Sequence, residues 1–319
     1  MEYAYLAAGL VLLVLGAELL VRGGVGFAER LGISQLVVGL TVVAWGTSAP
    51  ELLVALQAAL GGSPDITLGN VVGSNIFNVL AILGFTALIR PIRCEPRAIV
   101  RDATAGLFAA GAMFWIALHK THLSFLNGLS FIGALIVYSF LVYEMERGRA
   151  TAASRIHVEE VKVHEPIPSR LWLNLVLIAL GLAGLVGGSK LLVDNAVTIA
   201  RVWGVSETVI GLTLVAAGTS VPELATSVVA AVRGHSAIAL GNVLGSNIYN
   251  LLAILGVTAM VTPVPIPQRV ANFDIYLLLA VALAAMVPVF TGGRVGRVIG
   301  FVFLSFYAVY VGLLLGHSI

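Results

Sequence analysis

Hydrophobic residues occur in long runs, and short polar stretches separate one run from the next. A helix needs about 20 largely apolar residues to cross the hydrocarbon core of a membrane. We therefore expect ten membrane-spanning helices from the ten runs of roughly this length. They cover residues 3–26, 34–60, 66–89, 102–119, 123–145, 171–197, 206–232, 237–262, 272–290 and 297–316.

One polar segment is longer than the others. Residues 146–170 hold clustered charges together with Pro166 and Pro168. A stretch of this composition is typical of a linker. It divides the chain into a first five-helix unit at 1–145 and a second at 171–319.

The composition agrees with a membrane protein. Hydrophobic residues make up 59% of the chain and charged residues 11%, with a mean hydropathy of +1.02, whereas soluble domains carry about 25% charged residues. The surroundings are therefore expected to be the lipid bilayer, with no nucleic acid and no obligate protein partner indicated. Met1–Tyr5 lacks a basic leader, so the first run is expected to be a retained span. The single cysteine, Cys94, excludes an internal disulfide and a multi-cysteine metal site.

The positive charges predict an orientation. If the N-terminus lies outside the cell, the inward loops and helix ends hold fourteen Lys and Arg residues, and the outward ones hold three, Lys120, Arg201 and Arg269. Cytoplasmic loops of membrane proteins carry the excess of such residues. We predict a multi-pass protein of the cell (inner) membrane with both termini extracytoplasmic and the linker cytoplasmic.

The two halves repeat one sequence. GLTVVAWGTSAPE, from Gly39 to Glu51, recurs as GLTLVAAGTSVPE, and LGNVVGSNIFN, ending at Asn78, recurs as LGNVLGSNIYN, both 172 positions later (223 − 51 = 172; 250 − 78 = 172). From Gly39 to Gly84, 29 of 46 positions match. Because each half has an odd number of spans, the second is expected to insert with the opposite orientation, as in many secondary transporters. The predicted fold is an all-α membrane protein of two inverted five-helix repeats.

Each copy of the first motif places a glutamate, Glu51 or Glu223, near the middle of a hydrophobic span. A charge at the bilayer centre costs roughly 2.5–3.5 kcal/mol on insertion scales, so such residues usually belong to a site or pathway. Gly-Thr-Ser-x-Pro precedes each glutamate, and both glycine and proline disfavour a continuous helix. We expect these core helices to be broken at the motif, with carbonyl oxygens lining a cavity.

The two motifs offer oxygen ligands only. Ca²⁺ prefers six to eight oxygens, and Na⁺ is likewise a hard cation. His and Cys, which suit zinc and copper, are absent from both motifs. The candidate ligands are the carboxylates of Glu51 and Glu223, the hydroxyls of Thr47, Ser48, Thr219 and Ser220, and, from the second motif, Ser74, Asn78, Ser246 and Asn250.

Other polar residues in the spans have simpler explanations. A role in hydrogen bonds between helices and a role as ligands fit four further amides equally well: Asn70, Asn75, Asn242 and Asn247. Glu18 and Arg22 are four residues apart, and Lys190 and Asp194 occupy the corresponding positions of the second half. Ion pairs along a helix explain both pairs.

The string GTSAPE with GNVVGSNIFN, and GTSVPE with GNVLGSNIYN, resemble the alpha repeats of the cation/calcium antiporter superfamily, and in particular its prokaryotic sodium/calcium exchangers. One GTSxPE is a weak signal. Two copies, each followed 27 positions later by the Asn that ends GSNIxN (78 − 51 = 27), are specific. The resemblance implies a secondary active transporter that exchanges Na⁺ for Ca²⁺ by alternating access, with no enzymatic activity and no cofactor.

The resemblance also implies four clustered ion sites. Glu51 and Glu223 would be the carboxylates that the ions share, and the backbone carbonyls of Thr47 and Thr219 would join them on Ca²⁺. The flanking Na⁺ sites would use Ser48, Ser74, Ser220 and Ser246 with the carbonyls of Ala44 and Ala216. Asn78 and Asn250 would lie at the central position.

The central position departs from that of some relatives, which carry Asp where this chain has Asn78 or Asn250. The site then holds at most two formal negative charges. One Ca²⁺ would neutralise them and three Na⁺ would leave one positive charge, so three-to-one exchange would be electrogenic. The missing Asp also argues against the potassium-dependent branch.

Two other functions use the same residues. In proton/calcium exchange the glutamates would carry protons, which is feasible for buried carboxyl groups, although the Thr-Ser flanks favour sodium. A cation channel would need the same oxygen ligands, but a duplicated central site without a continuous polar helix stripe fits a carrier better. Neither an HExxH motif nor a nucleophile–base arrangement indicates an enzyme.

Overall fold

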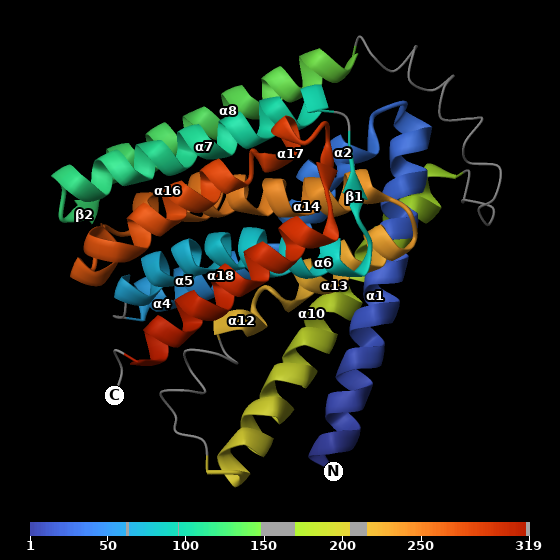
Figure 1. The fold of residues 1–319 in the computed structure, drawn as a ribbon, viewed down its shortest axis with the longest axis horizontal. Coiled ribbons are helices and arrows are strands. Elements are labelled where there is room, and N and C mark those ends of the chain that lie inside the picture. Colours follow the sequence, from blue (N-terminus) through green and yellow to red (C-terminus); the bar gives the residue numbers. More distant parts are fainter. Residues whose placement is uncertain (62–63, 95, 148–169, 205–215, 317–319) are drawn as a thin grey trace.

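The computed structural model describes residues 1–61, 64–94, 96–147, 170–204 and 216–316, and nearly all of them lie in helices (Figure 1). In the labels below, η marks a π-helical segment. The elements of the first half are α1 (Glu2–Leu31), α2 (Gln35–Val38), η1 (Gly39–Val43), α3 (Ala44–Thr47), α4 (Ala49–Leu60), α5 (Pro64–Phe77), η2 (Asn78–Leu83), α6 (Gly84–Ile89), β1 (Ile92–Arg93), α7 (Pro96–His119), β2 (His122–Leu123) and α8 (Phe125–Arg147). Those of the second half are α10 (Leu171–Val202), α12 (Ala216–Gly218), α13 (Val221–Val232), α14 (Ser236–Tyr249), η4 (Asn250–Ile254), α15 (Leu255–Val261), β3 (Val264–Pro265), η5 (Val270–Asp274), α16 (Ile275–Ala284), α17 (Val287–Phe290), β4 (Arg294–Val295) and α18 (Arg297–Gly316).

The helices agree with the predicted spans. Eight helices of the described part are long and apolar enough to cross a membrane, and the bent pair Gln35–Thr47 and Ala49–Leu60 makes a ninth if it counts as one span. The predicted span 206–232 is described only from residue 216 onward and ends in the apolar helix α13. The predicted linker 146–170 lies almost wholly outside the described residues.

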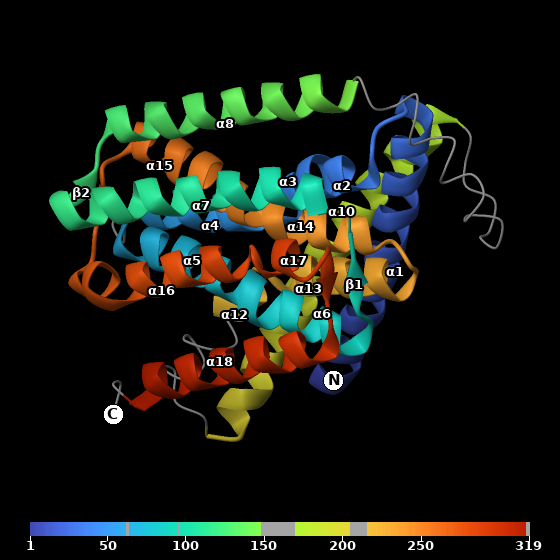
Figure 2. The ribbon, with the colours of Figure 1, turned by 45° about the horizontal axis from the view of Figure 1, so that its top comes forward.

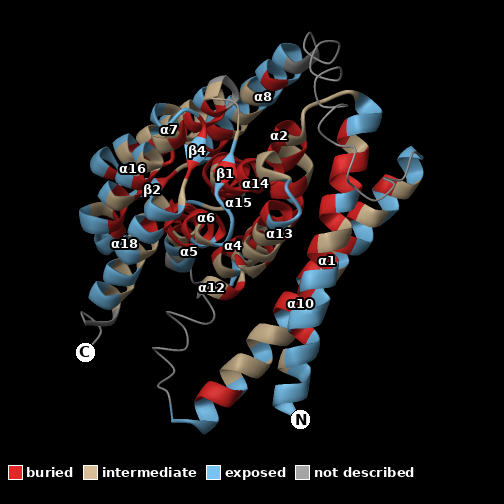
Figure 3. Cartoon of the chain, turned by 45° about the vertical axis from the view of Figure 1, so that its right-hand side comes forward, coloured by how far each residue is buried: buried red, intermediate tan, exposed pale blue. Residues whose placement is uncertain are grey.

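Burial separates the central helices from the outer ones. In the span Ser236–Val261, 83% of the residues of an apolar 18-residue stretch are buried. The same fraction is 17% for Phe125–Met145 and 11% for Arg297–Leu314. Figure 3 shows the buried residues gathered on α14, α15 and α6, with exposed residues on the outer helices. The exposed side chains include large apolar ones such as Phe108 and Phe301. Such a surface suits lipid rather than water, so the chain is a multi-span membrane protein.

The two longest helices, α1 and α10, lie antiparallel as a pair at one side of the body (Figures 1 and 3). A Cβ added at Gly16 would lie 2.7 Å from the Leu185 nitrogen, and one at Gly188 would lie 2.8 Å from the Leu13 nitrogen. Gly16 and Gly188 are corresponding residues of the two halves. The pair therefore approaches closely through glycines, as is common where membrane helices cross.

Elsewhere the two halves make corresponding contacts with each other. Strand β1 pairs with β4 and β2 pairs with β3, so each short sheet takes one strand from each half. Helix α8 packs on α15, and α18 packs on α6 (Figure 2). A Cβ at Gly128 would lie 2.5 Å from the Gly256 oxygen, and one at Gly300 would lie 2.6 Å from the Gly84 oxygen. The halves thus interlock through matched positions.

Both motif helices are broken, as predicted. The axes of Gln35–Thr47 and Ala49–Leu60 differ by 41°, with Ser48 between them at φ −85° and ψ 4°. In the second half α12 ends at Gly218, α13 begins at Val221, and Ser220 has a similar conformation, φ −93° and ψ 8°. The motif prolines lie in the first turn of the new helices, where a missing N–H donor costs little.

Candidate cation site

The two motif glutamates lie at the starts of helices inside the protein. Glu51 is in the first turn of α4 and Glu223 is in the first turn of α13, and each residue is only 1% exposed. The first turn of a helix carries a partial positive charge from its free N–H groups, which stabilises a carboxylate. The helix breaks therefore offset part of the cost of burying two acidic groups.

The motifs hold each other's carboxylates. Ser48 Oγ donates to Glu223 Oε1 at 3.0 Å, and Ser220 Oγ donates to Glu51 Oε1 at 3.1 Å. Ser220 Oγ also lies 3.4 Å from Ser74 Oγ, which brings the second motif into the same cluster. Residues that are more than 140 positions apart in sequence thus form one buried polar group.

Several oxygens of the predicted ligands lack a hydrogen-bond partner among the described residues. Each glutamate keeps Oε2 buried and unpaired. The same is true of Asn78 Oδ1, Asn250 Oδ1, Ser246 Oγ and Thr219 Oγ1. A buried polar atom without a partner costs about 1–3 kcal/mol, so a group of them requires an explanation. Carboxylate, amide and hydroxyl oxygens are the ligands that hard cations prefer.

The remaining predicted ligands either already have hydrogen-bond partners or adjoin residues outside the described part. Thr47 Oγ1 donates to Asn242 Oδ1 at 3.2 Å and lies 3.3 Å from the Ala44 oxygen, which also accepts from the Ser48 nitrogen at 3.0 Å. The Ala44 carbonyl is therefore already engaged by its own helix. Ala216 begins α12 directly after residues 205–215, which lie outside the described part.

Three of the four amides with an open role make hydrogen bonds. Asn242 Nδ2 donates to the Glu223 backbone oxygen at 3.1 Å and to Ser227 Oγ at 3.0 Å. Asn247 Oδ1 accepts from Asn78 Nδ2 at 3.0 Å, and Asn75 Nδ2 donates to the Val71 oxygen at 2.7 Å. For the fourth, the Nδ2 atom of Asn70 has no partner among the described residues.

The backbone changes at the two central asparagines. Asn78 begins the π-helical segment η2, and Asn250 begins η4. Single π-helical turns inside α-helices occur frequently at functional sites. The two segments occupy corresponding positions of the two halves, a feature that hydrophobic periodicity does not reveal.

Two buried aspartates lie outside the cluster and were not predicted. Tyr138 OH donates to Asp102 Oδ1 at 3.0 Å, and Tyr310 OH donates to Asp274 Oδ1 at 3.2 Å. Both pairs follow the repeat (274 − 102 = 172; 310 − 138 = 172). Arginines accompany both acids, with Arg101 Nε 2.6 Å from Asp102 Oδ1 and Arg269 Nε 3.4 Å from Asp274 Oδ2. These acids are paired, which is the usual state of buried charges that serve structure.

Known proteins match almost the whole length of this chain. The family model described as "Sodium/calcium exchanger protein" matches residues 1–144 and 173–316. The chain belongs to the sodium/calcium exchanger family. The matched segments include both glutamate motifs and leave out the predicted linker.

Relatives of this exchanger match along almost their whole length. The sodium/calcium exchanger MaX1 of Methanosarcina acetivorans is 32% identical over 98% of each chain. The putative antiporter CaxA of Alkalimonas amylolytica is 38% identical over 97% of each chain. Among solved structures, the sodium-calcium exchanger NCX_Mj, soaked with 2.5 mM Na⁺ and 0.1 mM Ca²⁺, superposes with a TM-score of 0.82 at 31% identity, covering 98% of this chain and 97% of that one. The chain is thus a membrane antiporter of the cation/Ca²⁺ type rather than an enzyme.

Proposed function

We propose that this exchanger moves Na⁺ and Ca²⁺ in opposite directions by alternating access at a site centred on Glu51 and Glu223. The observation that carries the proposal is the reciprocal pair of hydrogen bonds, Ser48 to Glu223 and Ser220 to Glu51, with both Oε2 atoms left unpaired among the described residues. Two kinds of ion that need the same two carboxylates cannot be bound together. Competition for the site therefore couples their opposite movements.

The proposed ligands are twelve residues, six from each half. Burial of the side chains at 3% exposure or less supports Glu51, Glu223, Ser48, Ser74, Ser220, Ser246, Asn78 and Asn250. Thr47, Thr219, Ala44 and Ala216 would contribute through backbone oxygens. If three Na⁺ exchange for one Ca²⁺, each cycle moves one net positive charge, so an imposed membrane potential should change the rate.

The proposed architecture is ten spans in two inverted repeats, 1–145 and 171–319, joined by a cytoplasmic linker at 146–170, with both termini outside the inner membrane. The matched contacts support it, since β1–β4 corresponds to β3–β2 and Gly128–Gly256 corresponds to Gly300–Gly84. The location in the inner membrane is supported by the inner membrane protein YrbG of Escherichia coli, which is 32% identical over 98% of this chain.

The native cysteine makes this topology testable. Burial raises the pKa of the Cys94 thiol to about 12, so it stays protonated, and slow to react, at every pH well below 12. The unchanged chain should resist a membrane-impermeant maleimide at pH 7 and at pH 9. With Lys120→Cys, whole cells should be labelled; with Ser154→Cys, labelling should require opened cells. The reverse pattern would overturn the orientation.

Calcium uptake into proteoliposomes tests the function. A Na⁺ gradient directed outward should drive Ca²⁺ uptake, and a pH gradient of equal size without Na⁺ should not. The hydroxyl-rich flanks of the glutamates and the family match both favour Na⁺ over H⁺. Uptake that follows only the pH gradient would overturn the sodium assignment.

A further inference from the structure

The amide of Asn78 has two ends, and only one of them can bind a cation. Its oxygen is a ligand for Na⁺ or Ca²⁺, whereas its NH₂ group would repel them. Asn78 is 1% exposed, its Nδ2 donates to Asn247 Oδ1 at 3.0 Å, and its Oδ1 has no partner among the described residues. The nitrogen is thus occupied by a neighbour, and the oxygen is left for a ligand.

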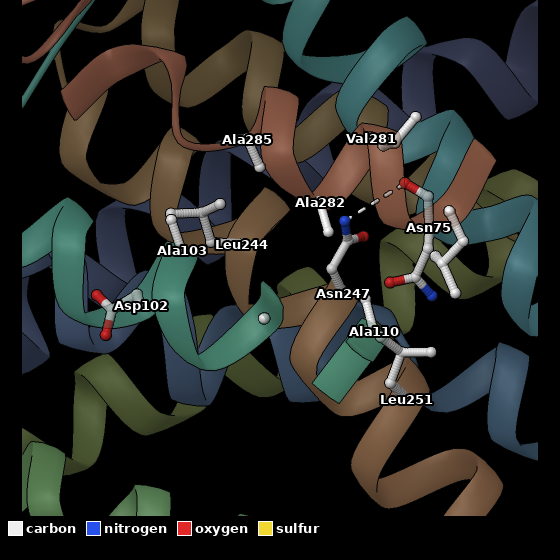
Figure 4. Close-up of a pocket in the computed structure, with 12 residues that line it drawn as sticks. Asn75, Asp102, Ala103, Ala110, Leu244, Asn247, Leu251, Val281, Ala282 and Ala285 are labelled. Atoms are coloured by element: carbon white, nitrogen blue, oxygen red, sulfur yellow. Dashed lines mark hydrogen bonds between the residues drawn. The ribbon is translucent and has the colours of Figure 1, made fainter. Parts of the chain in front are cut away.

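A backbone carbonyl sets this orientation. Asn247 Nδ2 donates to the Asn75 backbone oxygen at 3.3 Å, as the dashed line in Figure 4 marks. A carbonyl oxygen can only accept, so Asn247 must turn its NH₂ group to Asn75 and its oxygen to Asn78. Asn78 must then turn its NH₂ group to Asn247. Each hydrogen bond in this series can have only one donor and one acceptor end. The group at the end of the series is the Asn78 side-chain oxygen.

The surroundings of Asn247 offer few competing partners. Asn247 and Asn75 line a cavity of about 20 Å³ between α7, α14 and α16, whose other walls are mostly apolar, among them Leu244, Leu251 and Ala282 (Figure 4). Asp102 also borders this cavity, but its carboxylate is engaged by Arg101 and Tyr138.

We propose that Asn247 is a positioning residue for the transported cation, which holds the Asn78 amide with its oxygen free to bind. The proposal rests on the proposed function, in which Asn78 is a ligand. The repeat extends it to the other half, because Asn75 corresponds to Asn247 and Asn250 corresponds to Asn78. Asn75 Oδ1 and Asn250 Nδ2 are both buried and without a partner among the described residues. In the oppositely facing conformation Asn75 takes over the same task and accepts from Asn250 Nδ2.

The test is a double-mutant cycle read by Ca²⁺ binding to the purified full chain. Asn247→Leu removes the acceptor of the Asn78 NH₂ group, so the Asn78 amide is free to turn that group toward the cation. Ca²⁺ binding should then weaken about tenfold, the effect of one lost orienting hydrogen bond. Asn78→Asp makes both ends of that side chain oxygens, so orientation no longer matters. In the Asn78→Asp background the Asn247 oxygen has no donor to accept from, so Asn247→Leu should not weaken Ca²⁺ binding. Asn247→Ala, which removes the amide without adding an apolar group, should behave like Asn247→Leu.

A matched control is Asn195→Leu, because Asn195 Nδ2 bonds only to the Leu191 oxygen of its own helix in the described structure. It should leave the Ca²⁺ affinity unchanged. An equal loss from Asn247→Leu in both backgrounds would show a general structural role and overturn the proposal, as would no loss in either. If Asn78→Leu weakens Ca²⁺ binding and Asn247→Leu does not, the positioning role fails and the proposed site stands. If the unchanged chain binds no Ca²⁺, the proposed function fails, and the positioning role with it.

Discussion

Thr47 and Thr219 occupy corresponding positions of the two motifs but have different partners. Thr47 Oγ1 donates to Asn242 Oδ1, whereas Thr219 Oγ1 has no partner among the described residues and so makes no such bond to Asn70, the counterpart of Asn242. The residue types are identical in the two halves. The difference therefore comes from conformation, and it shows one motif in two arrangements within a single molecule. An alternating-access cycle would exchange the two arrangements between the halves.

A second difference between the halves comes from different residue types at corresponding positions. Glu18 of α1 accepts from Arg22 Nε at 2.6 Å and from Arg233 Nε, at the end of α13, at 2.8 Å. Glu18 corresponds to Lys190 of the second half, and Arg233 corresponds to Gly61 of the first half, and a glycine has no side chain to pair. An ionic link thus ties α1 to the core at one end, without a counterpart between these two positions.

The largest expected effect concerns the amides. Asn242 makes three hydrogen bonds, to Thr47, Glu223 and Ser227, so Asn242→Ala should lower the free energy of unfolding by about 3 kcal/mol at roughly 1 kcal/mol per bond. Asn70→Ala, its matched control, should cost less than about 1 kcal/mol. Thermal or denaturant unfolding of the detergent-solubilised protein measures both. Equal losses would show that the two halves do not differ as described.

Helix packing should show the next largest difference. A Cβ at Gly241 would lie 2.6 Å from the Leu36 oxygen and 3.0 Å from the Leu40 nitrogen. Both neighbours are backbone atoms that cannot turn aside, so Gly241→Ala should destabilise the protein by about 1–3 kcal/mol. Gly69, the corresponding residue, has no described atom within 4 Å of its Cβ position, and Gly69→Ala should be neutral or slightly stabilising. A larger loss at Gly69 than at Gly241 would contradict this packing.

The ionic link should have the smallest effect, and on rate rather than affinity. Arg233 is 52% exposed, so its bond to Glu18 is screened by water and contributes at most about 1 kcal/mol. Glu18→Gln and Arg233→Gln should therefore change the exchange rate by no more than about fivefold and leave the Ca²⁺ affinity unchanged. Lys190→Gln is the control, with no expected change of rate. A changed Ca²⁺ affinity in either link variant would mean that the contact belongs to the ion site.

The spans and the ion cluster could be predicted because both depend on rules that act along the sequence. The length of an apolar run sets a span, and a glutamate after Gly-Thr-Ser-x-Pro marks a broken core helix. The repeat also brought Ser48 and Ser220 into one candidate set, and the structure joins each of them to the opposite glutamate.

Other features needed the structure. Thr67 Oγ1 donates to the Ala55 oxygen at 3.0 Å, and in the second half Ser227 Oγ lies 3.5 Å from the Ala239 oxygen. The hydroxyl group therefore comes from opposite members of the helix pair in the two halves. Comparison of the two sequences gives two mismatches, Thr67 against Ala239 and Ala55 against Ser227, although a hydrogen bond joins the same pair of helices in both halves. Which end of the Asn247 amide faces Asn78 depends on the Asn75 backbone carbonyl opposite it, and no periodic pattern in the sequence reveals that contact. The Asp102–Tyr138 pair, by contrast, could have been predicted from the sequence, because the offset of 172 continues beyond Pro91.

Direct Ca²⁺ binding to the purified protein tests the central claim, that both ions share the Glu51–Glu223 site. The unchanged chain should bind Ca²⁺ and release it as Na⁺ is added. Glu51→Gln and Glu223→Gln should each weaken binding at least about 100-fold, since each removes a charged ligand worth roughly 3 kcal/mol. Glu144→Gln, at an exposed acid of α8, should bind like the unchanged chain. Wild-type Ca²⁺ affinity in either site variant, or Ca²⁺ binding indifferent to Na⁺, would contradict the account.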